Sequence, residues 1–161
     1  MTTTVFLAIL ALGEAPGIKG EFRQAELGQP TKPLSVAVQV GRKTMLLFGL
    51  TFNSKEEAEA VKKWLNDNYR HKQPPKVLPY KIVVEGSKPS EYAVIPRGGQ
   101  KVPIQHWMNA PGTMAKGILY DPDGRNLNAE FIRKGMARTK EKRFEDDQEE
   151  AKKNKVGIWA K

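Results

Sequence analysis

Two apolar runs within residues 35–52 constrain the fold more than any other feature of this chain. In the first, Val36, Val38 and Val40 alternate with smaller or polar residues, which is the period of a half-buried strand. A turn at 41–43 follows, and the next run is apolar nearly throughout. We therefore predict a β-hairpin whose second strand lies deep in a sheet.

A helix is predicted directly after this hairpin. Ser54 and Glu57 have the S-x-x-E spacing of a capping box, in which each side chain accepts a hydrogen bond from the other residue's backbone N–H. The helix should end near Arg70, before the prolines at 74–75. Its predicted apolar face is Ala58, Val61, Trp64 and Leu65, with Lys62, Lys63 and Asp67 opposite.

Short strands and turns make up most of the remaining pattern. Strands are predicted at 20–27, 80–84 and 117–120, and the turn 121–124 closes the last of them. Strands first, one helix across them, and then further strands and helices is the order of an α+β domain built around a small barrel.

Two C-terminal helices are predicted after that turn. The first covers 129–134, with Asn128 as its N-cap and Gly135 at the left-handed C-terminal position. The second covers about 144–154 and is highly charged. The aromatic and apolar residues around them are interpreted as core: Phe131, Ile132, Met136 and Trp159.

Residues 5–12 and 86–111 are harder to place in this order. The first segment is apolar but too short to span a bilayer, and is interpreted as a buried strand or a short core helix. It loosely resembles a signal sequence, but no positive charge precedes it. The second segment is rich in Gly and Pro and is predicted to be a long loop or an excursion hairpin.

The composition limits the possible chemistry and partners. The chain has 161 residues, a net charge of +9 and no cysteine, which excludes disulfides and thiolate-ligated metals. His71 and His106 are the only histidines, which argues against a histidine-based metal site. A polyanion is the natural partner of such a charge, although the charge could also only keep the protein soluble or dock it in a larger complex. The compartment stays unknown, and an intracellular one is favoured because there is no convincing signal peptide and no cysteine.

From Lys116 onwards the sequence resembles the staphylococcal nuclease (thermonuclease) family. The features are a strand, a D-G turn, the pair Leu127-Asn128, a short helix ending in R-x-G-x-A, and a last helix closing with E-A-K and G-I-W. The upstream hairpin, helix and strand occur in the family's order, so the resemblance covers about 34–161. It implies a single domain over 1–161 with a five-stranded OB-fold β-barrel and about three α-helices, an unmatched segment 1–33 and an inserted loop 86–111.

The resemblance also implies where catalytic residues should fall. Members of the family cleave phosphodiesters with a calcium ion held by acidic residues, a glutamate that assists the attacking water, and two arginines on the phosphate. Here the first arginine falls on Leu46, the metal-binding aspartate on Thr51 and the glutamate on Ser54, and at best Lys116 replaces the second arginine. The stretch 32–35, where an acidic turn is expected, has no acid. We therefore predict a degenerate site, with no metal or other cofactor, in a protein that is not an enzyme.

Other acidic residues could form a different site. Asp121 and Asp123 lie in a D-P-D-G sequence, for which a turn is the default and a metal role the alternative. The acids between 145 and 150 are interpreted as the solvated face of a helix. A divergent metal-dependent nuclease is kept as the third functional hypothesis.

Basic residues in two segments are candidate nucleic-acid contacts. The inserted loop interleaves basic and aromatic residues, a pattern that suits single-stranded DNA or RNA, although its aromatics could equally anchor the loop to the barrel. The second cluster, at 133–143, precedes an acidic run that can partly neutralise it. The candidate binding residues are Lys88, Tyr92, Arg97, Lys101, Lys116, Arg133, Lys134 and Arg138.

The leading functional hypothesis is thus a catalytically inactive nuclease-like OB-fold domain that binds nucleic acid. The alternative from another class is a structural or adaptor subunit of a larger protein or ribonucleoprotein assembly.

Overall fold

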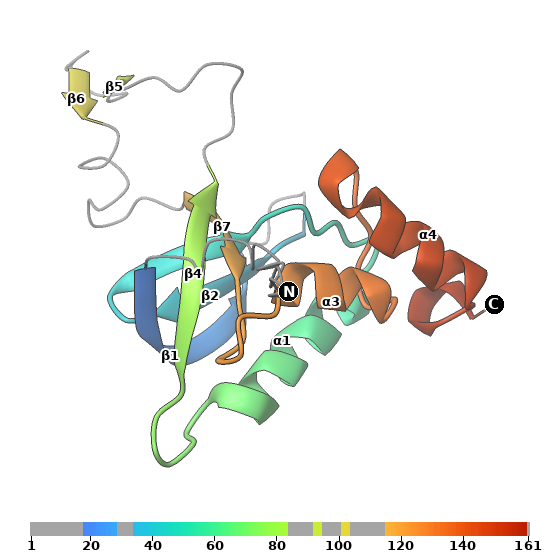
Figure 1. The fold of residues 1–161 in the computed structure, drawn as a ribbon, viewed down its shortest axis with the longest axis horizontal. Coiled ribbons are helices and arrows are strands. Elements are labelled where there is room, and N and C mark those ends of the chain that lie inside the picture. The colour runs from blue at the N-terminus through green and yellow to red at the C-terminus, as the bar shows by residue number, and fades with distance from the viewer. Residues whose placement is uncertain (1–17, 29–33, 84–91, 95–100, 104–114, 161) are drawn as a thin grey trace, which may run out of the picture.

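Five strands close into a barrel in the computed structural model, which describes residues 18–28, 34–83, 92–94, 101–103 and 115–160 (Figure 1). Their order around the barrel is β1-β2-β3-β7-β4, so the parallel neighbours β3 and β7 come from distant parts of the sequence. The other pairs are antiparallel. The strands are β1 (Ile18–Leu27), β2 (Val36–Val40), β3 (Lys43–Leu47), β4 (Val77–Val83) and β7 (Ala115–Leu119).

This barrel confirms the predicted α+β OB-fold class, with some strand ends shifted. β3 ends at Leu47 rather than continuing to residue 52, because Gly49 takes a left-handed φ of +76° and turns the chain. β4 begins at Val77, three residues before the predicted start. Pro79 lies within β4 and lacks an N–H, but its carbonyl accepts a hydrogen bond from the Tyr120 N–H at 2.9 Å.

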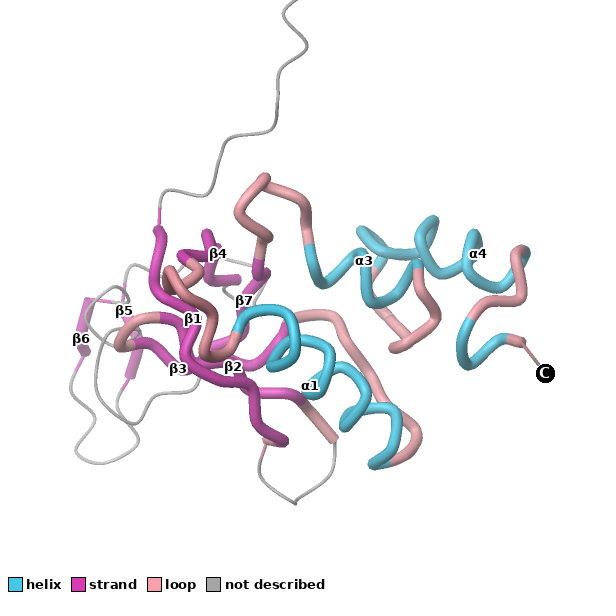
Figure 2. The backbone as a smooth tube through the Cα atoms, turned by 90° about the horizontal axis from the view of Figure 1, so that it is seen from below, coloured by secondary structure: helices cyan, strands magenta, loops and turns pink. Residues whose placement is uncertain are grey.

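The predicted helix is α1 (Lys55–Tyr69), and Ser54 is its N-cap as predicted. The Glu57 N–H donates to Ser54 Oγ at 3.4 Å, and the Glu57 carboxylate accepts from the Asn53 N–H at 2.8 Å. Ala58, Val61 and Leu65 are buried as predicted, while Trp64 is half-buried against the core. Figure 2 shows α1 lying alongside the β1 and β2 strands of the barrel.

The predicted N-cap at Asn128 is wrong. Helix α3 (Leu127–Arg133) begins two residues earlier than predicted, and its N-cap is Asn126, whose Oδ1 accepts from the Ala129 N–H at 3.1 Å. Asn128 lies inside the helix and is fully buried. Gly135 does take the predicted left-handed conformation, with φ +63°.

The C-terminal helix α4 (Glu145–Lys153) follows a 3₁₀ turn at Lys142–Phe144 and packs on α3, away from the barrel (Figure 2). A second 3₁₀ turn at Gly157–Trp159 ends the described chain. Phe131 and Ile132 are core residues as predicted, and Met136 packs against the core. Trp159 is half-buried rather than a core plug, and Arg138 and Lys152 flank its ring at 5.1 and 5.2 Å.

The insertion contains β5 (Tyr92–Val94) and β6 (Lys101–Pro103), which pair antiparallel as an excursion hairpin would. The apolar segment 5–12 lies outside the described residues. Among the helices that are described, none is long and apolar enough to cross a membrane.

Candidate functional site

Two of the four positions where the family resemblance places catalytic residues are neighbours on the barrel. In the parallel ladder between β3 and β7, Leu46 lies opposite Lys116. The same row continues to Ala37 on β2 and Val83 on β4. Leu46 is half-buried and Lys116 is exposed. The two positions where the family resemblance places phosphate-binding arginines are therefore a leucine and a lysine here.

The other two positions, Thr51 and Ser54, follow β3, where the chain leaves the barrel. Thr51 forms a backbone bridge with Arg138: the Thr51 N–H donates to the Arg138 carbonyl at 2.8 Å, and the Arg138 N–H donates back at 3.0 Å. Ser54 caps α1 through its hydroxyl oxygen. At both positions the contacts stabilise the fold.

One carboxylate does lie beside these positions, but it is paired. Both oxygens of Glu57 lie close to Arg138 Nη1, at 2.6 and 2.5 Å, and the side chains of Glu57 and Arg138 are only 15% and 23% exposed. Although burial works to raise it, hydrogen bonds from the Arg138 guanidinium and the Asn53 N–H hold the pKa of the Glu57 carboxyl below its ordinary value. The negative charge of Glu57 is thus balanced by the guanidinium of Arg138.

Asn128 fixes the barrel directly behind these positions. Its Oδ1 accepts from the Leu119 N–H at 3.0 Å, and its Nδ2 donates to the carbonyls of Phe48 and Gly117 at 2.8 and 3.1 Å. The amide therefore ties α3 to β7 and to the end of β3. Sequence reasoning missed this residue, since two asparagines two positions apart fit the capping signal equally well.

The C-terminal part of this fold also matches a known family. The model of the family described as staphylococcal nuclease homologue matches residues 109–161, which contain β7, α3 and α4. This part of the chain is similar to the staphylococcal nuclease family. No curated protein matches it. The family match confirms the predicted resemblance over these residues, and upstream of them the closed barrel agrees with the predicted OB-fold.

The acidic turn after β7 is structural. Asp121 is buried, and its carboxylate accepts hydrogen bonds from the backbone N–H groups of Asp123 and Arg125 at 2.9 and 2.8 Å and from Arg125 Nε at 2.6 Å. These contacts agree with the turn interpretation. Within the described part of the chain, no group of three or more acidic or histidine side chains could hold a metal ion.

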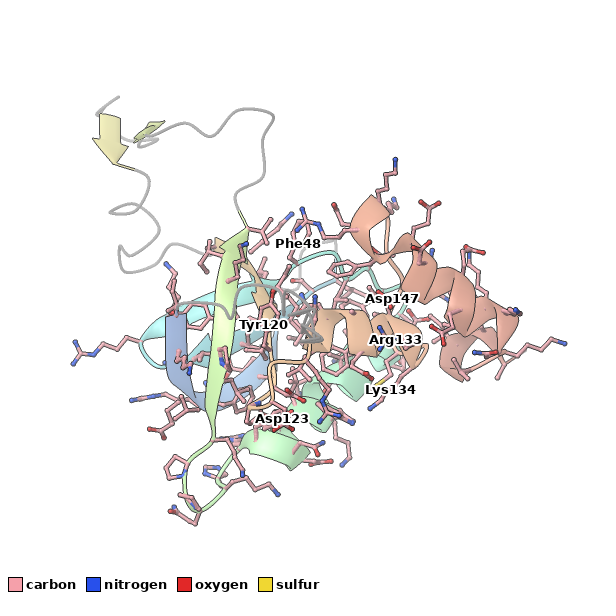
Figure 3. All side chains as sticks on the ribbon, in the orientation of Figure 1. Phe48, Tyr120, Asp123, Arg133, Lys134 and Asp147 are labelled. Carbon is pink, nitrogen blue, oxygen red and sulfur yellow. The ribbon has the colours of Figure 1, made fainter. Side chains whose placement is uncertain are left out.

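The basic cluster at 133–143 is partly neutralised, as the acidic run after it predicted. Arg133 Nη2 lies 2.6 Å from Asp147 of α4, and Arg133 Nη1 lies 3.0 Å from Glu130 (Figure 3). Lys134 lies 3.8 Å from Glu130 and 5.0 Å above the Trp64 ring. Together with Arg138, these residues already have charged partners within the protein.

The remaining predicted binding residues are less defined. Lys88 and Arg97 lie outside the described residues, and Tyr92 and Lys101 belong to β5 and β6, whose side chains are not described. Their role stays a prediction.

Sequence reasoning also missed a basic cleft at the other end of the barrel. It has a volume of about 380 Å³, and its lining includes Glu21, Phe22, Arg23, Tyr69, His71 and Lys72. The run R-H-K-Q-P-P-K at 70–76 was a signal in the sequence, but only the fold brings it next to β1.

Proposed function

We propose that this domain is a non-catalytic, nuclease-like OB-fold module that binds nucleic acid through its basic surface. The observation that carries the proposal is which residues stand where the family has catalytic residues, and what they contact. Leu46 offers no ligand atom, Thr51 and Ser54 stabilise backbone, and the neighbouring Glu57 is held by Arg138.

The requirements of metal-assisted phosphodiester cleavage support the non-catalytic part. A calcium ion takes six to eight oxygen ligands, with carboxylates among them. To recruit Glu57, the ion would have to displace a guanidinium hydrogen-bonded to that carboxylate. Lys116 supplies a point charge where an arginine would supply a bidentate fork. Hydroxyls and backbone carbonyls alone would hold the ion poorly.

The charge of the chain supports the binding part. A net charge of +9 favours polyanions, and small OB-type barrels often bind nucleic acid. Phosphate contacts release counterions, so the affinity should fall steeply as salt is raised.

The test is a titration of the full chain into fluorescent 20-mers of single-stranded DNA and RNA, read by anisotropy at several salt concentrations. The expected result is binding at low salt with a log–log slope of about −2 or steeper, equivalent to three or more phosphate contacts. The same oligonucleotides, incubated with and without calcium, should stay intact.

Two outcomes would overturn the proposal. Calcium-dependent cleavage that is abolished by changing Thr51, Asp121 or Asp123 would make the domain a divergent nuclease. Absence of binding at low salt, with co-purification of the native protein in a larger complex, would instead support the structural-subunit hypothesis.

A further inference from the structure

Cations of this domain differ in whether the protein already neutralises them. Arg125, Arg133 and Arg138 each lie within 2.6 Å of a carboxylate oxygen. The exposed cations Arg23, Arg70, Lys72 and Lys76 take part in none of the ion pairs found among the described residues. An incoming anion would meet this second set without displacing a carboxylate.

The fold gathers this second set around one cleft. β1 and β4 pair with Glu21 opposite Val77, and the Phe22 N–H donates to the Lys76 carbonyl at 2.8 Å. These contacts place the turn between α1 and β4 beside Arg23. Lys72 and Arg23 line the cleft of about 380 Å³, while Arg70 and Lys76 adjoin its lining residues in sequence.

Cations outnumber carboxylates in the lining of this cleft. Arg23 and Lys72 line it, Arg70 and Lys76 adjoin lining residues in sequence, and Glu21 is the one carboxylate among the lining residues. Tyr69 adds no negative charge, because its burial and the nearby Asp121 raise its pKa to about 12. The Tyr69 ring packs 5.7 Å from Phe22 and belongs to the wall of the cleft.

Stabilisation of the α1 C-terminus does not account for these cations. The helix dipole places about half a negative charge at that end, and its effect falls off within the last turn. No basic residue lies in the last turn of α1, and Arg70, Lys72 and Lys76 all follow the helix. Half a negative charge also opposes an incoming anion far less than the net charge of these side chains attracts it.

The cleft is separate from the family's catalytic positions. β4 runs from Val77, beside the cleft, to Val83, which lies opposite Lys116 (Figure 1). The two ends are six residue steps apart along the strand, which is roughly 20 Å.

We infer that this cleft between β1 and the α1–β4 turn binds the phosphate backbone of nucleic acid. The inference rests on the proposed function and gives it a location away from the nuclease-like positions. The occupant is a phosphodiester chain because the cations lie along an edge formed by two segments, and a polyanion can contact several of them at once.

The test compares two triple variants that each remove three positive charges. The cleft variant combines Arg23→Gln, Lys72→Gln and Lys76→Gln. The matched control combines Lys55→Gln, Lys142→Gln and Lys153→Gln, three exposed lysines on other elements that are also outside the ion pairs found. A charge-conserving triple, Arg23→Lys with Lys72→Arg and Lys76→Arg, separates loss of charge from loss of fold, and thermal melts check all three.

Binding of a single-stranded 20-mer should weaken by roughly 100-fold at 0.1 M salt in the cleft variant, with a slope shallower by about 2, because each lost phosphate contact removes about 0.7 from the slope. The control and the charge-conserving variant should stay near the wild type. Equal losses in the cleft variant and the control would overturn the cleft while leaving nucleic-acid binding intact. No wild-type binding would overturn both. Equally tight binding of poly-glutamate, lost in the same variant, would reassign the cleft to an acidic protein.

Discussion

Asn128 should contribute more to stability than a polar residue on a short helix usually does. Truncation by Asn128→Ala leaves the Leu119 N–H and the Phe48 carbonyl without their side-chain partner, while the Gly117 carbonyl keeps the Phe48 N–H at 2.8 Å. Each orphaned buried backbone group costs about 1–3 kcal/mol, so we expect a loss of about 4 kcal/mol in the free energy of unfolding. In a domain of this size that lowers Tm by about 8–16 °C.

Asn128→Asp tests the direction of the hydrogen bonds. The variant keeps the acceptor for the Leu119 N–H but turns its second oxygen toward the carbonyl oxygens of Phe48 and Gly117. A buried carboxylate facing two acceptors is disfavoured, so its folded-state pKa should rise above the unfolded value of about 3.9. The penalty is then absent below about pH 4 and grows by about 1.4 kcal/mol per pH unit up to the folded-state pKa.

Asn126→Asp is the matched control, because it makes the same change two residues earlier at the N-cap. Aspartate is as good an N-cap as asparagine, so this variant should stay within about 0.5 kcal/mol of the wild type. Urea unfolding at pH 4 and pH 7, read by tryptophan fluorescence, gives the free energies. If N128D and N126D lose equal stability at pH 7, the assignment of Asn128 as a buried tie between α3 and the barrel is wrong.

Two further predictions concern the Glu57–Arg138 ion pair and the left-handed glycine Gly135 after α3. Glu57→Gln keeps the helix cap but loses the charge opposite Arg138, and should destabilise the fold by about 1–2 kcal/mol at pH 7. Because the folded-state pKa of Glu57 is lowered, this stabilisation is present above its unfolded pKa and is lost as pH falls through the folded pKa. A difference in unfolding free energy between wild type and variant that persists at pH 2 in urea titrations would contradict this reasoning. Gly135→Ala should cost about 2 kcal/mol more stability than Gly124→Ala in thermal melts. Both glycines have positive φ, but a Cβ at 135 would lie 2.2 Å from the Val156 carbonyl oxygen, whereas one at 124 meets nothing within 4 Å. Equal losses of stability would exclude the steric reason.

Local signals in the sequence were enough to predict the elements of the fold. The alternation at Val36, Val38 and Val40 predicted β2, and the Ser54–Glu57 spacing predicted the first turn of α1. These signals work because strand period and helix capping depend on residues two to four positions apart. Together with the order of elements they also predicted the barrel.

Such local patterns could not predict contacts between segments that are distant in sequence. Glu57 and Arg138 are 81 residues apart, and neither has a neighbour in sequence that points to the other. Asn128 differs from Asn126 in its hydrogen bonds to Leu119, Gly117 and Phe48, the last of which is 80 residues away in sequence. The basic cleft likewise needs β1 to meet the turn after α1.

Ion pairing also decides which cations can add affinity for a phosphate. At Arg133 or Arg138 an arriving phosphate must replace a carboxylate that already makes a charge-assisted hydrogen bond at 2.6 Å. One such bond is exchanged for another, and the released carboxylate then repels the phosphate. At Lys72 or Lys76 the phosphate replaces only counterions and water, and the release of counterions is favourable. The predicted basic cluster at 133–143 and the cleft beside β1 therefore differ in what a bound phosphate displaces, although both are basic in sequence. This difference is why we expect the phosphate-binding surface of the domain at the cleft.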